Sequence, residues 1–270
     1  MLYLCATPIG NLEDMTFRAI RILREVNLIA AEDTRRTRKL LTHFEIHTPL
    51  CRFDENCKES VAEKILQRLQ AGESVAIVSD AGLPAISDPG ADLVRLAIDA
   101  GITVCPIPGA NAALSALICS GLDTSRFLFA GFAPKTKKNR RDFLQKLSTA
   151  EETVIFYEAP HRLKDFLAEL AEIFGDRQAV LARELTKVHE EFLRGKISEL
   201  IEKIPEPRGE FVVLVEGNKT APPQSEENPL DFYRKLLEQG LDKKEAMRET
   251  AKKFNVSRRE IYNTLLREEI

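Results

Sequence analysis

Short hydrophobic runs alternate with amphipathic stretches through the first 121 residues. The runs that predict strands lie at 2–6, 28–31, 50–53, 75–78 and 102–105. The stretches that predict helices lie at 16–26, 35–41, 60–70, 90–100 and 111–120. Regular alternation of strand and helix predicts a mostly parallel sheet that helices cover on both faces. We therefore predict a first α/β domain over residues 1–121.

The pattern changes after Gly121. Apolar runs at 127–132, 154–157, 179–182 and 211–215 predict strands, the last of them strongly β-branched, and 190–194 is compatible with a further strand. Helices are expected at 139–148, 161–173 and 197–203. This less regular order predicts a second α/β domain with a mixed sheet over residues 122–217.

The end of the chain has a different character. Residues 218–229 are polar and rich in proline, which is typical of a linker. Residues 230–270 read as helix, helix, turn, helix, with Ser257 as the cap of the last helix, and resemble a helix-turn-helix that reads nucleic acid. A purely structural helical tail fits equally well, because ten basic and eight acidic residues nearly balance in this piece.

Composition excludes several classes of protein. The 270 residues carry a net charge of −3, and no apolar run is long enough to span a membrane. The five cysteines include no C-x-x-C pair, which indicates reduced thiols in the cytoplasm. His43 and His47 are four residues apart but lack a third ligand, so we expect no metal site.

Three predicted strands end in unusual loops, at 8–11, 80–90 and 106–111. Because carboxyl ends of parallel strands meet at one edge of a sheet, we expect these loops to form one ligand site. Asp80 follows the strand at 75–78 directly, and Asp88-Pro89 suits a helix start. An ordinary turn would also use such residues, but two carboxylates and two prolines exceed what a turn requires. The common dinucleotide, P-loop and hydrolase motifs are absent from the sequence.

Two basic clusters are candidates for binding nucleic acid. One is a predicted loop that enters the helix at 139–148, with Lys135, Lys137, Lys138, Arg140 and Arg141. The other follows the second strand, with Arg35, Arg36 and Arg38. Phosphate contact is one reading of such clusters, and a solvated surface is the other.

Polar residues also follow two strands of the second domain, around Glu158 and around Lys187. Acid and base side chains at strand ends are candidates for proton transfer. A structural network of ion pairs would use the same residue types, and the sequence leaves both readings open.

Taken in order, several motifs together resemble one family. They are ATPIGNL at 6–12, AEDTR at 31–35, SDAG at 79–82, SDPG at 87–90, YEAPHR at 157–162 and ARELTK at 182–187. Over residues 1–217 the chain resembles the ribosomal RNA methyltransferases of the tetrapyrrole methylase superfamily, and its tail is similar to the helical domain appended there. The alternatives are a methylase of a small tetrapyrrole-like substrate and a helix-turn-helix DNA regulator with a metabolite-sensing domain.

The resemblance implies S-adenosylmethionine as methyl donor, bound between the two α/β domains of a cytoplasmic homodimer. It implies 2′-O-methylation of a cytidine in the decoding region of 16S ribosomal RNA, on naked RNA or the small ribosomal subunit. The positions that match the cofactor loops are Pro8, Gly10, Asp80, Leu83, Asn111 and Ala112. The family usually has threonine at the position of Leu83, so a side-chain hydrogen bond is lost there. Glu158 falls near the methionine end, and Lys187 or Glu158 would assist proton transfer.

Overall fold

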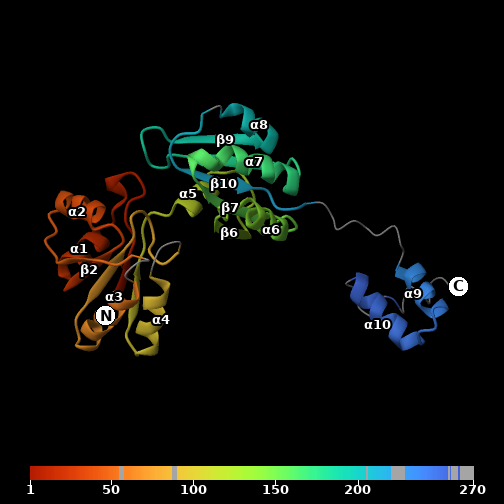
Figure 1. Ribbon diagram of the computed structural model, residues 1–270, viewed down its shortest axis with the longest axis horizontal. Coiled ribbons are helices and arrows are strands. Elements are labelled where there is room, and N and C mark those ends of the chain that lie inside the picture. Colours follow the sequence, from red (N-terminus) through yellow and green to blue (C-terminus); the bar gives the residue numbers. More distant parts are fainter. Residues whose placement is uncertain are drawn as a thin grey trace. The chain divides into compact units, whose positions relative to one another are not determined.

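The computed structural model describes residues 1–54, 58–86, 90–204, 206–219, 229–254, 256 and 261. The chain divides into two compact units, Met1–Asn218 and Lys219–Ile270. Within the first unit lie two five-stranded sheets (Figure 1). The predicted boundary near residue 121 falls inside this unit, where the chain passes from one sheet to the other, and it stays a prediction.

The first sheet is parallel throughout. Its strands are β1 (Leu2–Cys5), β2 (Leu28–Ala31), β3 (Leu50–Arg52), β4 (Val75–Val78) and β5 (Val104–Ile107), in the order β3-β2-β4-β1-β5. The intervening helices are η1 (Leu12–Asp14), α1 (Phe17–Glu25), α2 (Thr34–His43), α3 (Lys58–Gln70) and α4 (Ala91–Asp99).

Side-chain alternation along the strands separates two cores. Ala31 and Val78 pack with α1 and α2 on one face, whereas Ala30 and Ile77 pack with α3 and α4 on the other. Because both faces are buried, these strands read as continuous apolar runs. The predicted parallel sheet with helices on both faces is confirmed.

Two of the boundaries that differ from the sequence prediction flank the loops of the expected ligand site. The last strand of the first sheet runs over Val104–Ile107, two residues later than expected, and includes Pro106. Proline is tolerated there because β5 is an edge strand of the sheet. Helix α4 begins at Ala91 after Gly90, so it starts later than the predicted Asp88-Pro89, which lies outside the described residues.

The second sheet is mixed. Its strands are β6 (Phe127–Phe132), β7 (Thr153–Glu158), β8 (Gln178–Arg183), β9 (Glu191–Lys196) and β10 (Phe211–Val215), in the order β6-β7-β10-β8-β9. Only the pair β6–β7 is parallel among these described strands. The helices are α5 (Ala112–Ile118), α6 (Lys137–Leu147), α7 (Pro160–Phe174) and α8 (Ile197–Lys203).

The two faces of this sheet are covered differently. Helices α6, α7 and α8 pack on one face, around Phe156 and Phe166, whereas α5 packs on the other, against Ile155 and Val212. The predicted mixed sheet is confirmed. The predicted loop at 135–141 is wrong in part, because α6 begins at Lys137 and takes most of this segment into the helix.

The second unit contains α9 (Pro229–Glu238) and α10 (Lys243–Phe254). The rings of Phe232 and Phe254 pack edge to face with centroids 5.7 Å apart. Ser257 and the expected last helix over 258–266 lie almost entirely outside the described residues, so the helix-turn-helix stays a prediction. No helix in the described part of the chain is both long and apolar enough to cross a membrane.

Candidate active site

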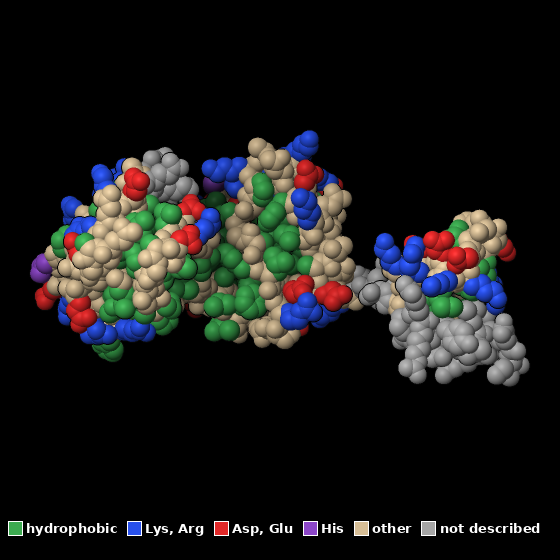
Figure 2. Space-filling view, turned by 90° about the horizontal axis from the view of Figure 1, so that it is seen from below, with side chains coloured by type: hydrophobic (Ala, Val, Ile, Leu, Met, Phe, Trp, Pro, Cys, Tyr) green, Lys and Arg blue, Asp and Glu red, His purple; other side chains and the backbone are tan. Residues whose placement is uncertain are grey.

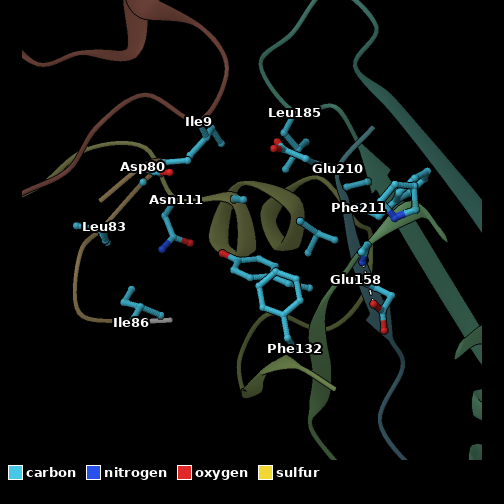
Figure 3. A pocket seen from close by; sticks show the side chains of 18 of the residues that line it. Ile9, Asp80, Leu83, Ile86, Asn111, Phe132, Glu158, Leu185, Glu210 and Phe211 are labelled. Atoms are coloured by element: carbon cyan, nitrogen blue, oxygen red, sulfur yellow. Dashed lines mark hydrogen bonds between the residues drawn. The ribbon is translucent and has the colours of Figure 1, made fainter. Parts of the chain in front are cut away.

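A cavity of about 430 Å³ opens at the carboxyl ends of the first sheet and reaches the second sheet (Figure 3). From the first sheet it is lined by Ile9, Glu32, Asp80, Ala81, Gly82, Leu83, Ile86, Asn111 and Ala112. From the second sheet it is lined by Phe132, Tyr157, Glu158, Ala159, Pro160, Ala182, Leu185, Glu210, Phe211 and Val212. A volume of this size suits a small-molecule ligand.

The three predicted loops converge at Gly82. The Thr7 N–H donates to the Gly82 carbonyl oxygen at 2.9 Å, and the Gly82 N–H donates to the Thr7 carbonyl oxygen at 3.1 Å. Gly82 has a φ of +82°, and a Cβ there would lie 3.3 Å from Ile9 Cγ2 and 3.4 Å from the Ala110 carbonyl oxygen. A glycine at this position therefore lets the loops after β1, β4 and β5 approach one another closely.

Four of the six predicted cofactor residues line this cavity: Asp80, Leu83, Asn111 and Ala112. Pro8 and Gly10 are not among the lining residues that the structure describes, whereas Ile9 between them is. Gly10 instead meets the segment 185–187 of the second sheet, since a Cβ there would lie 2.5 Å from Lys187 Cγ. In the first loop, Gly10 thus contacts the segment 185–187, whereas Ile9 lines the cavity.

Asp80 holds the start of helix α2. Its Oδ1 accepts a hydrogen bond from the Asp33 N–H at 3.0 Å, and its Oδ2 lies 3.2 Å from Arg36 Nη1. The Asp80 side chain remains 23% exposed toward the cavity. Arg36, predicted to contact RNA, is therefore tied to the carboxylate that is predicted to face the cofactor.

The charged residues that line the cavity in the described ranges share one sign. Among the described residues that line it, every charged one is acidic: Glu32, Asp80, Glu158 and Glu210. Carboxylates favour a cationic ligand and disfavour a phosphate at short range. Asp80 and Glu210 are also paired with cations outside the lining, Arg36 and Lys187, but the acidic groups are the ones that line the cavity. The lining is therefore compatible with a positively charged ligand, such as a sulfonium.

Glu158 is buried at the end of β7, where it contacts the start of α7. It shares the face of β7 that carries Phe156 and packs beneath the helices, and its side chain is completely buried. Oε1 accepts the Ala159 N–H at 2.8 Å and lies 3.3 Å from Arg162 Nε, whereas Oε2 has no hydrogen-bond partner among the described residues. Burial raises the pKa of Glu158. This geometry favours a role in holding the start of α7 over contact with substrate.

Lys187 is held by two carboxylates. Its ammonium donates to Glu184 Oε1 and to Glu210 Oε2, each at 2.9 Å. Partial burial opposes the charged form, but these hydrogen bonds outweigh it and raise the pKa of Lys187. Lys187 is therefore an ammonium at neutral pH, which can stabilise negative charge but cannot accept a proton.

The predicted RNA-binding residues fall into two groups. Exposed ones are Arg35, Arg36, Arg38, Lys135, Lys137 and Lys138. Arg35 bonds the Asp33 carboxylate and lowers the pKa of Asp33 to about 2. Arg140 is buried in a bidentate pair with Glu169, both bonds being 2.7 Å, and Arg141 pairs with Glu172. Because its guanidinium is buried against Glu169, Arg140 is not accessible to a phosphate, and we exclude it from the exposed basic residues.

Sequence reasoning missed several lining residues. Tyr157 was recognised in the motif at 157–162 but was not assigned to the cofactor site. Glu32, Glu210 and Phe132 depend on how the loops and the two sheets meet, which no local pattern specifies. Without Glu32 and Glu210, the sequence prediction did not show that the charged residues lining the cavity in the described part of the chain are all acidic.

Comparison with known proteins defines the class. The family model of the Tetrapyrrole (Corrin/Porphyrin) Methylases matches residues 1–201. Diphthine synthase shares the fold, with a TM-score of 0.61 at 14% identity over 80% of this chain and 89% of that one. So does a uroporphyrin-III C-methyltransferase from Thermus thermophilus complexed with S-adenosylhomocysteine, with a TM-score of 0.58 at 17% identity over 80% and 96% of the chains. Fold and cavity thus define a methyltransferase of the tetrapyrrole methylase type.

One curated relative is more specific. The ribosomal RNA small subunit methyltransferase I of Halalkalibacterium halodurans is 50% identical over 269 residues, which cover 97% of this chain and 93% of the relative. The protein of the same name from Bacillus subtilis (strain 168) is 49% identical over 271 residues, with the same coverage. This chain belongs to the ribosomal RNA small subunit methyltransferase I family, whose methyl donor is S-adenosylmethionine.

Proposed function

We propose that this protein transfers a methyl group to the 2′ hydroxyl of a cytidine in the decoding region of 16S ribosomal RNA. The main support is the cavity, whose charged lining residues are all acidic among those described. Exposed lysines that suit a polyanion lie close in sequence to the lining residue Phe132. The names of its relatives support a substrate in the small ribosomal subunit. Such a substrate lies in the cytoplasm, which is the compartment that we propose.

The lining residues fit the cofactor. Asp80 offers a carboxylate to its cationic part, and the backbone at Leu83 and Ala112 offers polar groups that do not depend on the missing threonine hydroxyl. Asn111 Oδ1 is used to cap α5 through the Leu114 N–H, at 2.9 Å. When bound, S-adenosylmethionine supplies an already activated methyl group.

The remaining task of the protein is to position the ribose and manage its proton. Apolar side chains around the cavity, such as Leu83, Ile86 and Phe211, exclude water, and fixed placement of reactants contributes much of catalysis. We propose that the Lys187 ammonium, which bonds the cavity-lining Glu210, stabilises negative charge that develops on the 2′ oxygen. Glu158 keeps a positioning role at the start of α7.

Exposed basic residues would hold the RNA backbone. Lys135, Lys137 and Lys138 lie three to six residues after the cavity-lining Phe132, and Arg35 and Arg38 project from α2. Each phosphate that they neutralise would release counterions, so binding should weaken steeply with salt. The substrate would be naked RNA or the assembled subunit.

A homodimer is also proposed. Leu114 and Ile118, one turn apart on α5, are 45% and 76% exposed, and Phe127 on the edge strand β6 is 42% exposed. Figure 2 shows hydrophobic side chains gathered on the side of the unit Met1–Asn218 where β6 lies. A second copy would cover such an apolar surface, and sedimentation of the purified protein at twice the chain mass is the expected result.

The proposed reaction has a direct test. Purified protein is incubated with methyl-labelled S-adenosylmethionine and small ribosomal subunits from cells that lack the mark, and the RNA is digested to nucleosides. Label is expected in 2′-O-methylcytidine at a decoding-region position. Label on a base nitrogen or carbon would overturn the mechanism, and absence of any transfer to RNA would overturn the proposed substrate.

Replacing Asp80 by asparagine is expected to weaken S-adenosylmethionine binding about tenfold or more. Asparagine keeps an acceptor for the Asp33 N–H but removes the negative charge, and a hydrogen bond to a charged group contributes roughly 1.5–3 kcal/mol. Calorimetric titration measures the affinity. Asp99→Asn on the exposed end of α4 is the control, and equal affinities of the two variants would exclude Asp80 from the cofactor site.

A further inference from the structure

Phe132 is an aromatic residue that lines the cavity and yet remains 58% exposed. Its ring projects between Asn111 and Glu158 in the close view of the pocket (Figure 3). A phenylalanine gains stability by burial, so an exposed ring at a cavity calls for an explanation beyond packing.

A β-bulge aims this ring. The register of β6 against β7 shifts between Phe129 and Gly131, and Gly131 has a φ of +65°. Without the extra residue, Phe129 and Phe132 would point to opposite faces of the sheet. In the structure both rings pack edge-on against Tyr157, with centroids 5.0 and 5.5 Å from it, and so share the cavity face. Bulges with glycine in this conformation are frequent beside active sites, where they redirect a side chain.

The chain after Phe132 is fixed. Arg162 Nη2 donates to the carbonyl oxygens of Ala133 and Pro134, at 2.9 and 3.1 Å, and Ala133 is buried. The Glu158 carboxylate lies 3.3 Å from Arg162 Nε and so fixes the arginine in turn. The pair of buried Glu158 and partly buried Arg162 therefore supports the segment that presents Phe132.

Exposed lysines follow immediately. Lys135, Lys137 and Lys138 are all exposed, and Thr136 between them is the residue that precedes α6. One rim of the cavity thus combines an exposed aromatic ring with three positive charges. This combination is what proteins use to hold single-stranded nucleic acid, with bases stacked on rings and phosphates on cations.

We infer that Phe132 is the surface on which an unpaired pyrimidine base of the substrate stacks, while the neighbouring lysines contact the flanking phosphates. The inference rests on the proposed function and names the group that recognises the nucleotide. A nucleotide that leaves its base stack to bring its ribose into a recessed cavity loses its base contacts, and stacking on Phe132 would compensate for that loss.

The test uses a short single-stranded ribo-oligonucleotide with the fluorescent base pyrrolocytosine at its centre. Wild-type protein is expected to quench the fluorescence on binding, because stacking on a ring quenches this base. Phe132→Ala should abolish the quench and weaken binding about tenfold, and Phe132→Tyr should restore both. Phe132→Ala should raise KM for small ribosomal subunits by a larger factor than it lowers the calorimetric affinity for S-adenosylmethionine.

Two variants serve as controls. Phe17→Ala removes a ring that is 93% exposed on α1 and does not line the cavity, so it should leave quench and affinity unchanged. Lys137→Ala should weaken binding and reduce its salt dependence while the quench at saturation persists, because it removes a phosphate contact and no stacking surface.

The outcomes separate the inference from the proposed function. The inference alone would be overturned if the wild type methylates subunits while Phe132→Ala shows the same quench and the same KM as the wild type. Absence of a quench with wild-type protein would overturn it as well. Sedimentation of Phe132→Ala at half the mass of the wild type would make Phe132 a subunit contact instead. Failure of the wild type to methylate any RNA would overturn the proposed function itself.

Discussion

Replacing Gly10 by alanine is expected to weaken S-adenosylmethionine binding by about tenfold or more, because overpacking a fitted contact costs roughly 1–3 kcal/mol. A Cβ at this position would lie 2.5 Å from Lys187 Cγ, 2.9 Å from Thr186 Oγ1 and 3.0 Å from the Leu185 carbonyl oxygen. The loop 8–11 would have to move away from the second sheet. Ile9 in that loop lines the cavity, so the displacement would change the binding site directly. Calorimetric titration measures the loss.

A double substitution shows whether the close approach is the cause. Lys187→Ala removes the Cγ atom that the new methyl group would meet first, so adding it to Gly10→Ala should recover part of the lost affinity. The affinities of the two single variants and the double variant form a complete cycle. Purely additive losses would mean that Gly10 is needed for another reason.

Replacing Arg140 by methionine is expected to lower the free energy of unfolding at pH 7 by about 3–5 kcal/mol. The Arg140 and Glu169 side chains are only 10% and 9% exposed and share two hydrogen bonds of 2.7 Å. Methionine fills much of the space but leaves the Glu169 carboxylate buried and unpaired. Urea denaturation followed by circular dichroism measures the change.

The effect should depend on pH in a defined direction. The hydrogen bonds from Arg140 lower the pKa of Glu169, so the pair stabilises the wild type above the ordinary glutamate pKa, and this contribution is lost as pH falls through the lowered pKa. In the variant the buried carboxyl can escape its penalty by protonation. The difference between variant and wild type should therefore shrink between pH 7 and pH 4.

Arg141→Met is the matched control for Arg140→Met. Arg141 lies next to it on α6 and pairs with Glu172, but these side chains are 36% and 61% exposed. Such a surface pair contributes about 0–1 kcal/mol, so the control should be close to wild type. Equal destabilisation by the two substitutions would contradict the role assigned to the buried pair.

The sequence predicted the architecture well because its signals are local. Short apolar runs such as Val75–Val78 and Phe211–Val215 are buried on both faces, so the strands were found without knowledge of their neighbours. Glycine and proline marked the loops that meet at Gly82. The strand Val104–Ile107 was predicted two residues too early because proline usually ends a strand. Pro106 is tolerated here only because β5 lies at the edge of the sheet, which the sequence does not reveal.

The site was harder to predict because its chemistry depends on contacts across the molecule. Arg140 looked like part of a basic loop, and only its partner 29 residues away shows that it is buried. Lys187 and Glu158 were recognised as ionisable residues at strand ends, but the two carboxylates around Lys187 and the burial of Glu158 are set by distant parts of the chain. The position of Phe132 depends on one extra residue in β6, which period-two reasoning cannot detect.

The acidic lining of the cavity has a consequence for turnover. Once its methyl group has left, the spent donor is a neutral thioether and has lost one positive charge. The attraction from Asp80, Glu32 and Glu210 then falls, whereas shape and apolar contacts barely change. If these carboxylates hold the donor as we propose, they favour exchange of the used donor for a fresh one.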